Sequence, residues 1–290
     1  MTDIYLTGFT GAIGQRILPK LKEKNFKVYP INLRDLANLQ SYKQISDNSW
    51  MIHLASINSK MTDSHISIEV GLMKLAIDVA LKKGIQNFIF FSSSKLYPAS
   101  ANKALTTEDS EICSKDPYSQ GKLECESIIK ANLKKFKSVT ILRLAPVLIR
   151  SKSSNVNLLF KLCETLPVVP IFSAGNQNQR SFLSFRNLER FLEVYVKKNI
   201  EGLNILNLCD KSPITTNMLI NEFLTKYRPK VTKLELPKFL EIIFLNMPIL
   251  GLKLNSLFAD NIVYNNKLLT ELSDLNLLET SEAINIFGLH

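Results

Sequence analysis

A tyrosine and a lysine that could move protons to and from a substrate stand four residues apart in Asp116-Pro-Tyr118-Ser-Gln-Gly-Lys122. On a helix this spacing places both side chains on one face, one turn apart. A lysine ammonium beside a phenol stabilises the phenolate, so the tyrosine could exchange a proton with a substrate oxygen near neutral pH. An ordinary exposed tyrosine and lysine have the same spacing, so the pair becomes informative only beside other signals.

Three serine hydroxyls follow an apolar stretch in Phe90-Phe-Ser92-Ser-Ser94-Lys-Leu-Tyr97. The carboxyl ends of parallel strands face the ligand crevice of an α/β sheet, so we expect these hydroxyls at a binding site. A serine there can hydrogen-bond a substrate oxygen while the charge of that oxygen changes. The alternative is a polar strand end or a helix cap.

Three glycines follow the first apolar stretch, in Thr7-Gly8-Phe-Thr-Gly11-Ala-Ile-Gly14. Such a turn lets the backbone approach a pyrophosphate closely and aims the N-terminus of the next helix at it. Because the motif stands between a predicted strand and a predicted helix, it predicts a dinucleotide site, with close packing as the alternative use of the glycines. The expected cofactor contacts here are Gly8, Gly11, Ala12, Ile13 and Gly14.

Strands and helices alternate in the first half of the chain. The predicted strands are Ile4–Leu6, Trp50–Ala55, Asn87–Phe91 and Val139–Leu144, and the predicted helices are His65–Lys83 and Tyr118–Lys135. Their apolar runs are typical of buried parallel strands separated by helices. This order predicts an α/β fold with a doubly wound parallel sheet of the Rossmann type.

The character of the sequence changes after residue 150, where a polar stretch is followed by less regular segments with several prolines. We therefore predict a dinucleotide-binding domain over residues 1–150 and a smaller, mostly C-terminal lobe over residues 151–290 that binds the substrate. Some of its segments, such as Gly202–Leu208, are expected to return to the main sheet.

Composition limits the classes of partner and site. The net charge is +10, but no recognised nucleic-acid-binding module accompanies it, so we predict no nucleic-acid partner. The three histidines and four cysteines have no metal-like spacing, which predicts no metal site. Without a secretory leader, the cysteines are expected to be reduced thiols of a cytoplasmic protein.

The most apolar segment is Phe239–Leu250. It is too short to span a bilayer, and we predict no transmembrane segment. The segment is interpreted as a buried or surface-packed helix, with peripheral membrane contact as the alternative.

The motifs resemble, in their order along the chain, those of the extended short-chain dehydrogenase/reductases, in the branch that acts on nucleotide sugars. The matching residues are the glycine turn, His53-Leu-Ala55, the Ser92-Ser93 strand end and the Tyr118/Lys122 pair. The resemblance implies that Tyr118 is the proton donor or acceptor. It also implies that Lys122 tunes Tyr118 and holds the nicotinamide ribose, while Ser93 orients the substrate carbonyl.

Two segments in the second half of the chain resemble those of one subgroup of the family. Asn157 lies in a stretch that resembles the family's substrate-contacting segment, and Arg180 lies in one that carries an arginine to the substrate pyrophosphate. A guanidinium there suits bidentate contact with a diphosphate. Together with Ser93-Ser94-Lys95 as further substrate contacts, these segments look most like bacterial 4-keto reductases and epimerases that act on UDP-N-acetyl-deoxyhexoses for surface polysaccharides.

The resemblance also implies which dinucleotide binds. Where the family often has an acidic residue that grips both ribose hydroxyls of NAD, this chain has Asn32, and Arg34 follows. A neutral residue with a nearby cation suits a 2′-phosphate, which favours NADP(H) over NAD(H), and a simply solvated Arg34 is the alternative. The further expected cofactor contacts are Asn32, Arg34, Asp35, Leu36, Leu54, Ala55, Ser56, Tyr118 and Lys122.

Two positions depart from the family's pattern. Glu69 stands where many relatives have an asparagine near the active site, and Leu148-Ile-Arg150-Ser replaces a Tyr-Gly-Pro turn. Either departure could alter the substrate pocket. Neither removes the set of Ser93, Tyr118 and Lys122.

Three functions follow from these residues. The leading hypothesis is NAD(P)H-dependent reduction of a 4-keto nucleotide sugar. The second is a nucleotide-sugar 4-epimerase that holds NAD tightly and uses the same residues. The third, from another class, is a non-catalytic regulator that binds NADP. Helices His65–Lys83 and Tyr118–Lys135 could pair across a homodimer.

Overall fold

The computed structural model describes residues 2–35, 46, 48–57, 61–98, 105–114, 116–149, 155–198, 200–248, 250–272 and 275–284. Two residues that the sequence singles out, Leu36 and Arg150, lie outside these ranges.

The main sheet has six parallel strands, which confirms the predicted fold class. Their order in space is β2-β1-β3-β4-β5-β9. The strands are β1 Asp3–Thr7, β2 Lys27–Ile31, β3 Ser49–His53, β4 Asn87–Ser93, β5 Ser138–Leu144 and β9 Gly202–Leu208. The segment expected to return to the sheet from the second half of the chain is β9, which pairs with β5.

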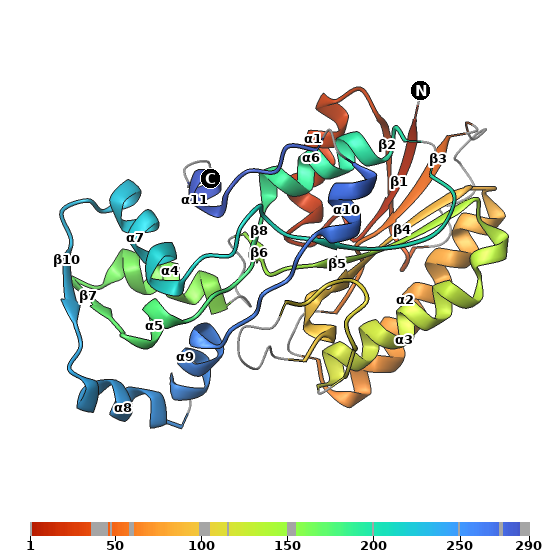
Figure 1. Cartoon of the computed structure of the whole chain (residues 1–290). Coiled ribbons are helices and arrows are strands. Elements are labelled where there is room, and N and C mark those ends of the chain that lie inside the picture. The colour runs from red at the N-terminus through yellow and green to blue at the C-terminus, as the bar shows by residue number, and fades with distance from the viewer. Residues whose placement is uncertain are drawn as a thin grey trace.

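Helices cover both faces of this sheet. Figure 1 shows α2 (Asp63–Lys82) and α3 (Pro117–Ala131) side by side on one face, with α1 (Gly14–Glu23), α6 (Phe185–Tyr195) and α10 (Asn266–Glu271) on the other. Successive strand residues alternate between the two resulting cores, because side chains of a strand point to opposite faces in turn. Ile4 and Leu6 thus pack with α1 and α6, whereas Tyr5 packs with α2 and α3.

The chain reverses its direction of travel across the sheet at β1. It moves from β1 to β2 on one side and then returns to β3 on the other side of β1. Thr7 and His53, the last residues of β1 and β3, are partners in the register. In open α/β sheets, ligands bind outside the carboxyl ends of the strands at such a switch point. The order of the strands therefore predicts a ligand site at the loops after β1 and β3.

A polar network inside the protein holds α3 against the sheet. Glu126 of α3 accepts hydrogen bonds from Ser92 Oγ (2.7 Å), and from Arg143 Nε (3.0 Å) and Nη2 (2.8 Å). Arg143 Nη1 also donates to the Tyr97 hydroxyl (3.0 Å), which donates to Asn207 Oδ1 of β9 (2.7 Å). Buried charges are stable in a fold when they are paired and hydrogen-bonded in this way. The network fixes the second half of α3 relative to the ends of β4 and β5.

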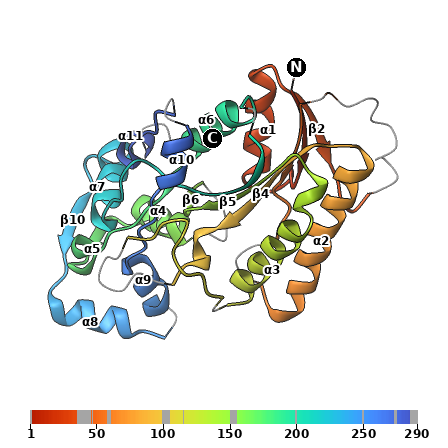
Figure 2. The same cartoon turned by 45° about the vertical axis from the view of Figure 1, so that its right-hand side comes forward.

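The smaller lobe has a core of its own. Phe160 and Phe223 stack at its centre with ring centroids 4.4 Å apart. Its helices are α4 Asn155–Thr165, α5 Ala174–Gln177, α7 Thr216–Tyr227, α8 Lys238–Asn246, α9 Leu250–Phe258 and α11 Thr280–Ile284. Two parallel strand pairs complete it, β7 (Val168–Ile171) with β10 (Thr232–Glu235), and β6 (Val147–Leu148) with β8 (Leu183–Ser184). Figure 2 shows this lobe at one end of the main sheet.

Two predicted helices end earlier than expected. The helix predicted over Tyr118–Lys135 ends at Ala131, where Asn132 Nδ2 donates to the Ile128 carbonyl (2.9 Å), and a short 3₁₀ turn follows. The apolar segment Phe239–Leu250 is divided between α8 and α9, with Pro248 at the break, because a proline cannot continue a helix. Within the described ranges no single helix is long and apolar enough to cross a membrane; α8 and α9 pass that test only as a pair, bent by 114°.

Candidate functional site

The turn after β1 has a shape that only glycine permits. Gly8 has a φ of +69°, and a Cβ on it would lie 2.4 Å from the Ala55 nitrogen. A Cβ on Gly14 would lie 2.2 Å from the Gly8 oxygen. The Gly11 amide donates to that same oxygen (3.0 Å), which closes the turn just before α1 begins at Gly14.

This turn fits a dinucleotide. Ala12 is exposed and Ile13 is half-buried, immediately before α1. The amides of Gln15 and Ile17 in the first turn of α1 donate to the Gly11 and Ile13 carbonyls (both 2.9 Å), so the turn leads directly into the helix. A backbone free of side chains, followed by a helix N-terminus, is suited to a pyrophosphate. Gly8, Gly11 and Gly14 could therefore hold the diphosphate of a nicotinamide dinucleotide.

The ends of β1 and β3 are joined by a buried hydrogen bond. Thr7 Oγ1 lies 2.8 Å from His53 Nδ1, and the Ala55 amide donates to the same Thr7 oxygen (3.4 Å). Burial, together with the nearby Lys122 charge, lowers the pKa of His53 to about 3. His53 is therefore a neutral imidazole at physiological pH, and it serves to align the two strand ends beside the glycine turn.

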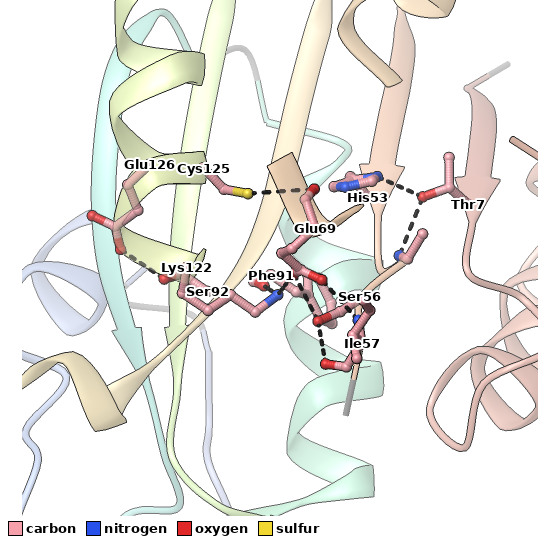
Figure 3. Close-up of polar contacts among 11 residues, drawn as sticks. Thr7, His53, Ser56, Ile57, Glu69, Phe91, Ser92, Lys122, Cys125 and Glu126 are labelled. Atoms are coloured by element: carbon pink, nitrogen blue, oxygen red, sulfur yellow. Dashed lines mark hydrogen bonds and ion pairs between the residues drawn. The ribbon is translucent and has the colours of Figure 1, made fainter. Parts of the chain in front are cut away.

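A buried ion pair forms the centre of the site (Figure 3). Lys122 Nζ lies 3.0 Å from Glu69 Oε1, and the two side chains are 4% and 1% exposed. The ammonium also donates to the Phe91 carbonyl of β4 (3.0 Å). Glu69 accepts two more hydrogen bonds, from Ser56 Oγ (2.7 Å) and from the Ile57 amide (2.7 Å). One carboxylate thus connects α2, α3 and the loop after β3.

The surroundings of Lys122 keep it charged. Burial alone would lower the pKa of this lysine, but the Glu69 carboxylate opposes that effect and the pKa is raised above its ordinary value. A lysine in this state is a fixed positive charge at the carboxyl end of β4. It can stabilise an anion that forms close to it.

Tyr118 lies beside two cations. Its ring centroid is 5.9 Å from Lys122 Nζ and 5.3 Å from Lys95 Nζ. The start of α3 sets this position, because Asp116 accepts a hydrogen bond from the Ser119 amide (3.1 Å) and Pro117 occupies the first turn. The structure thus brings together Tyr118 and Lys122 as the four-residue spacing predicts.

The three serines after β4 have different surroundings. Ser92 is buried and bonds to Glu126, so it belongs to the internal network. Ser93 is half-buried, and its Oγ accepts the Lys95 amide (3.2 Å) as the cap of a 3₁₀ turn. Ser94 Oγ is buried and has no hydrogen-bond partner within the described part of the chain. Ser93 and Ser94 both lie at the strand end where a substrate oxygen is expected.

The loop after β2 carries the residues predicted to select the dinucleotide. Asn32, Arg34 and Asp35 are exposed, and Asn32 Oδ1 accepts a hydrogen bond from the Arg34 amide (3.1 Å). This contact fixes the loop at the end of β2 and leaves the guanidinium at the surface. Leu54, Ala55 and Ser56 follow β3 on the other side of β1.

The two substrate residues predicted in the smaller lobe differ in their surroundings. Asn157 is half-buried on α4. Arg180 is buried, and its Nη1 donates to the Ser256 (2.6 Å) and Ala259 (2.8 Å) carbonyls at the end of α9. Burial lowers the pKa of Arg180 to about 10, and its Nε has no partner within the described residues. Contact between Arg180 and a diphosphate stays a prediction, in which Nε would be the hydrogen-bond donor.

Sequence reasoning missed the partners of two carboxylates. It marked Glu69 as a departure from the family without finding its ion pair, because its partner Lys122 is 53 positions away in the chain. It also missed Glu126, which stands four positions after Lys122, one helical turn further along α3. That spacing was the available signal, although it could not reveal the partner Arg143 on β5.

Residues 4–198 match the model of the family described as the NAD-dependent epimerase/dehydratase family. This match confirms the family resemblance that was inferred from the motifs. No curated protein matches the chain.

Solved structures with the same fold cover nearly the whole chain. UDP-N-acetylglucosamine 4-epimerase from Bacillus cereus is 17% identical, with a TM-score of 0.71 over 98% of this chain and 97% of its own. A dTDP-4-dehydrorhamnose reductase from Bacillus anthracis in complex with NADP is 13% identical, with a TM-score of 0.73 over 98% of both chains. MoeE5 in complex with UDP-glucuronic acid and NAD is 16% identical, with a TM-score of 0.72 over 98% and 96%. These similarities show the fold.

The neutral state of buried His53 predicts how stability depends on pH. The unfolded chain binds a proton at His53 below about pH 6.5, whereas the folded chain binds it only near pH 3. Stability is therefore lost as the pH falls, and this residue should remove about 2 kcal/mol from the free energy of unfolding between pH 7 and pH 5. Urea unfolding at both pH values measures the loss.

The matched variants are His53→Asn, which should reduce this pH dependence, and His65→Asn on α2, which should retain it. An equal pH dependence in wild type and His53→Asn would contradict the assignment.

Proposed function

Because the chain belongs to the NAD-dependent epimerase/dehydratase family, we propose that it reduces the 4-keto group of a nucleotide sugar with NAD(P)H. The proposed substrate is of the UDP-N-acetyl-deoxyhexose type, and the proposed role is surface polysaccharide biosynthesis. The observation that carries the proposal is the buried Glu69–Lys122 ion pair next to Tyr118. A fixed cation beside a phenol is what proton transfer to a carbonyl oxygen requires.

The cofactor would be held at the switch point of the sheet. The turn from Gly8 to Gly14 would receive the pyrophosphate, and Lys122 would hold the nicotinamide ribose. When bound, a reduced nicotinamide supplies the hydride that adds to C4 of the sugar. We propose residues 1–150 as the domain that serves this purpose and residues 151–290 as the lobe that mainly binds the sugar nucleotide.

The protein's own residues would supply the proton and the orientation. Tyr118 would donate its phenolic proton to the carbonyl oxygen as that oxygen becomes a hydroxyl, and Lys122 would stabilise the phenolate that remains. Ser93 would donate a hydrogen bond to the same oxygen and hold it in line with Tyr118. The phenolate would then regain a proton from solvent before the next cycle.

Substrate contacts would come from both lobes. Ser94 Oγ has no partner among the described residues and would bond to a sugar hydroxyl or amide. Lys95 is exposed and would contact the diphosphate. Arg180 would donate to the diphosphate through Nε, which is buried and has no partner among the described residues. Asn157 would contact the nucleotide sugar from α4.

Tyr118→Phe tests the mechanism. Loss of the phenolic proton should lower kcat for reduction of a 4-keto sugar nucleotide by roughly 10²- to 10⁴-fold. Cofactor affinity should stay within about twofold, because the ring remains in place. Stopped-flow loss of NAD(P)H absorbance measures the first quantity, and quenching of protein fluorescence by the cofactor measures the second.

The matched control is Tyr227→Phe in the smaller lobe, which should keep full activity. A Tyr118→Phe protein that keeps full activity would overturn the mechanism. Purification of the wild-type protein with one tightly held NAD per chain would instead favour the 4-epimerase, which uses the same residues.

Arg34→Ala tests the choice of cofactor. The proposed NADPH preference depends on an exposed guanidinium next to neutral Asn32, which suits a 2′-phosphate. The variant should bind NADPH about tenfold more weakly and NADH as before. Arg186→Ala, which removes an exposed arginine from α6, should change neither affinity. Tighter binding of NADH than NADPH by wild type would contradict this assignment.

A further inference from the structure

Helix α8 presents three of its six apolar side chains to solvent. In Lys238–Asn246 the single buried residue is the acid Glu241, which is 4% exposed. Phe239, Ile242 and Ile243 are 63%, 61% and 57% exposed. A surface helix ordinarily buries its apolar side and exposes its charges. Helix α8 instead buries its acid and packs Phe244 against Phe172, and it leaves the three exposed apolar side chains available for a partner.

The buried acid explains this orientation. Glu241 Oε2 accepts a hydrogen bond from Ser173 Oγ (2.6 Å), and Oε1 accepts one from the Ala174 amide (3.0 Å). Both bonds lie at the first turn of α5, where a carboxylate satisfies amides that the helix leaves without a partner. The two bonds fix the rotation of α8 about its axis. They hold Phe239, Ile242 and Ile243 away from the protein.

The exposed apolar surface continues around the break into α9. Met247 and Leu252 are 42% and 73% exposed, whereas Leu254 and Leu257 on the other side of α9 are buried. A Cβ on Gly251 would lie 2.2 Å from the Leu245 oxygen, so close packing of the two helices requires glycine there. We define the α8–α9 corner as Phe239, Ile242, Ile243, Met247 and Leu252. Figures 1 and 2 both show α8 at the end of the smaller lobe that is remote from the main sheet.

The exposed charged side chains of α8 and α9 are both lysines. Lys238 and Lys253 are exposed, and Glu241, the one acid of residues 238–258, is buried. An apolar surface flanked by lysines is complementary to a surface that is apolar inside and anionic outside.

We propose that the α8–α9 corner docks the protein on the surface of an anionic lipid membrane. The exposed side chains of the corner would enter the boundary between headgroups and acyl chains, and the flanking lysines would lie at the lipid phosphates. The two helices would lie on the membrane and not cross it. Each has nine residues and is about 14 Å long, against a hydrocarbon core of about 30 Å, and the pair bends by 114°.

Charge favours lipid over a second copy of the chain. Two copies that met through this corner would bring the lysines of both molecules, Lys238 and Lys253, to one interface. Neither α8 nor α9 offers an exposed carboxylate to pair with them. Like charges across an interface oppose association, whereas anionic headgroups would neutralise the lysines.

Sedimentation with lipid vesicles tests the proposal on the full chain. Wild type should bind vesicles that contain phosphatidylcholine and phosphatidylglycerol, and it should bind vesicles of phosphatidylcholine alone about tenfold more weakly. The corner variant Ile242→Ser with Ile243→Ser should lose about tenfold in binding to the anionic vesicles. The charge variant Lys238→Glu with Lys253→Glu should lose binding similarly, and added salt should weaken the binding of wild type.

The matched control is Met218→Ser on α7, which replaces an exposed apolar side chain outside the corner (54% exposed) and should bind as wild type does. All substituted side chains are exposed, so circular dichroism melting should show unchanged folding for each variant. Equal binding of the folded corner variant and wild type would overturn the proposal. So would a wild type that ignores anionic vesicles but changes from dimer to monomer in the corner variant, measured by analytical ultracentrifugation.

Discussion

The ion pair between Glu69 and Lys122 is the interaction on which the rest of the site depends. Both side chains are buried, and each charge would cost several kcal/mol to remove from water without the other. Because Glu69 also binds the loop after β3 and Lys122 also binds β4, the pair holds two helices and two strand ends in one arrangement. Loss of one partner would leave the other charged and buried, at a typical cost of about 3 to 5 kcal/mol.

The buried polar groups around the site have structural roles, and they are distinct from the residues proposed to act on the substrate. His53 is neutral and bonded to Thr7, and Glu126 is satisfied by Arg143 and Ser92, so these buried groups hold the strand ends and α3 in place. Tyr118 and the end of β4 remain beside the switch point of the sheet. The parallel order of the strands brings them together, since it collects the carboxyl ends of β1, β3 and β4 at one edge.

Local patterns were sufficient to predict most of the framework. The apolar runs predicted four of the six sheet strands, and β9 was expected to join the sheet, while the four-residue spacing predicted that Tyr118 and Lys122 share a face of α3. Contacts that depend on tertiary placement were beyond such patterns. The Nη1 of Arg180 donates to carbonyls at the end of α9. Glu241 accepts a hydrogen bond from Ser173, which orients Phe239, Ile242 and Ile243 of α8 toward solvent. In both cases the partner is remote in sequence. The end of α3 at Ala131 depends on a side-chain bond of Asn132.

The charge state of Lys122 tests the central claim most directly. Lysine-selective NMR of the side-chain nitrogen can follow its titration, with the resonance assigned through Lys122→Arg. The account predicts that Lys122 of the wild-type protein titrates above the ordinary lysine pKa of 10.5 and that Glu69→Gln lowers the pKa of Lys122. A wild-type Lys122 that loses its proton near neutral pH, or a pKa that Glu69→Gln leaves unchanged, would contradict the account.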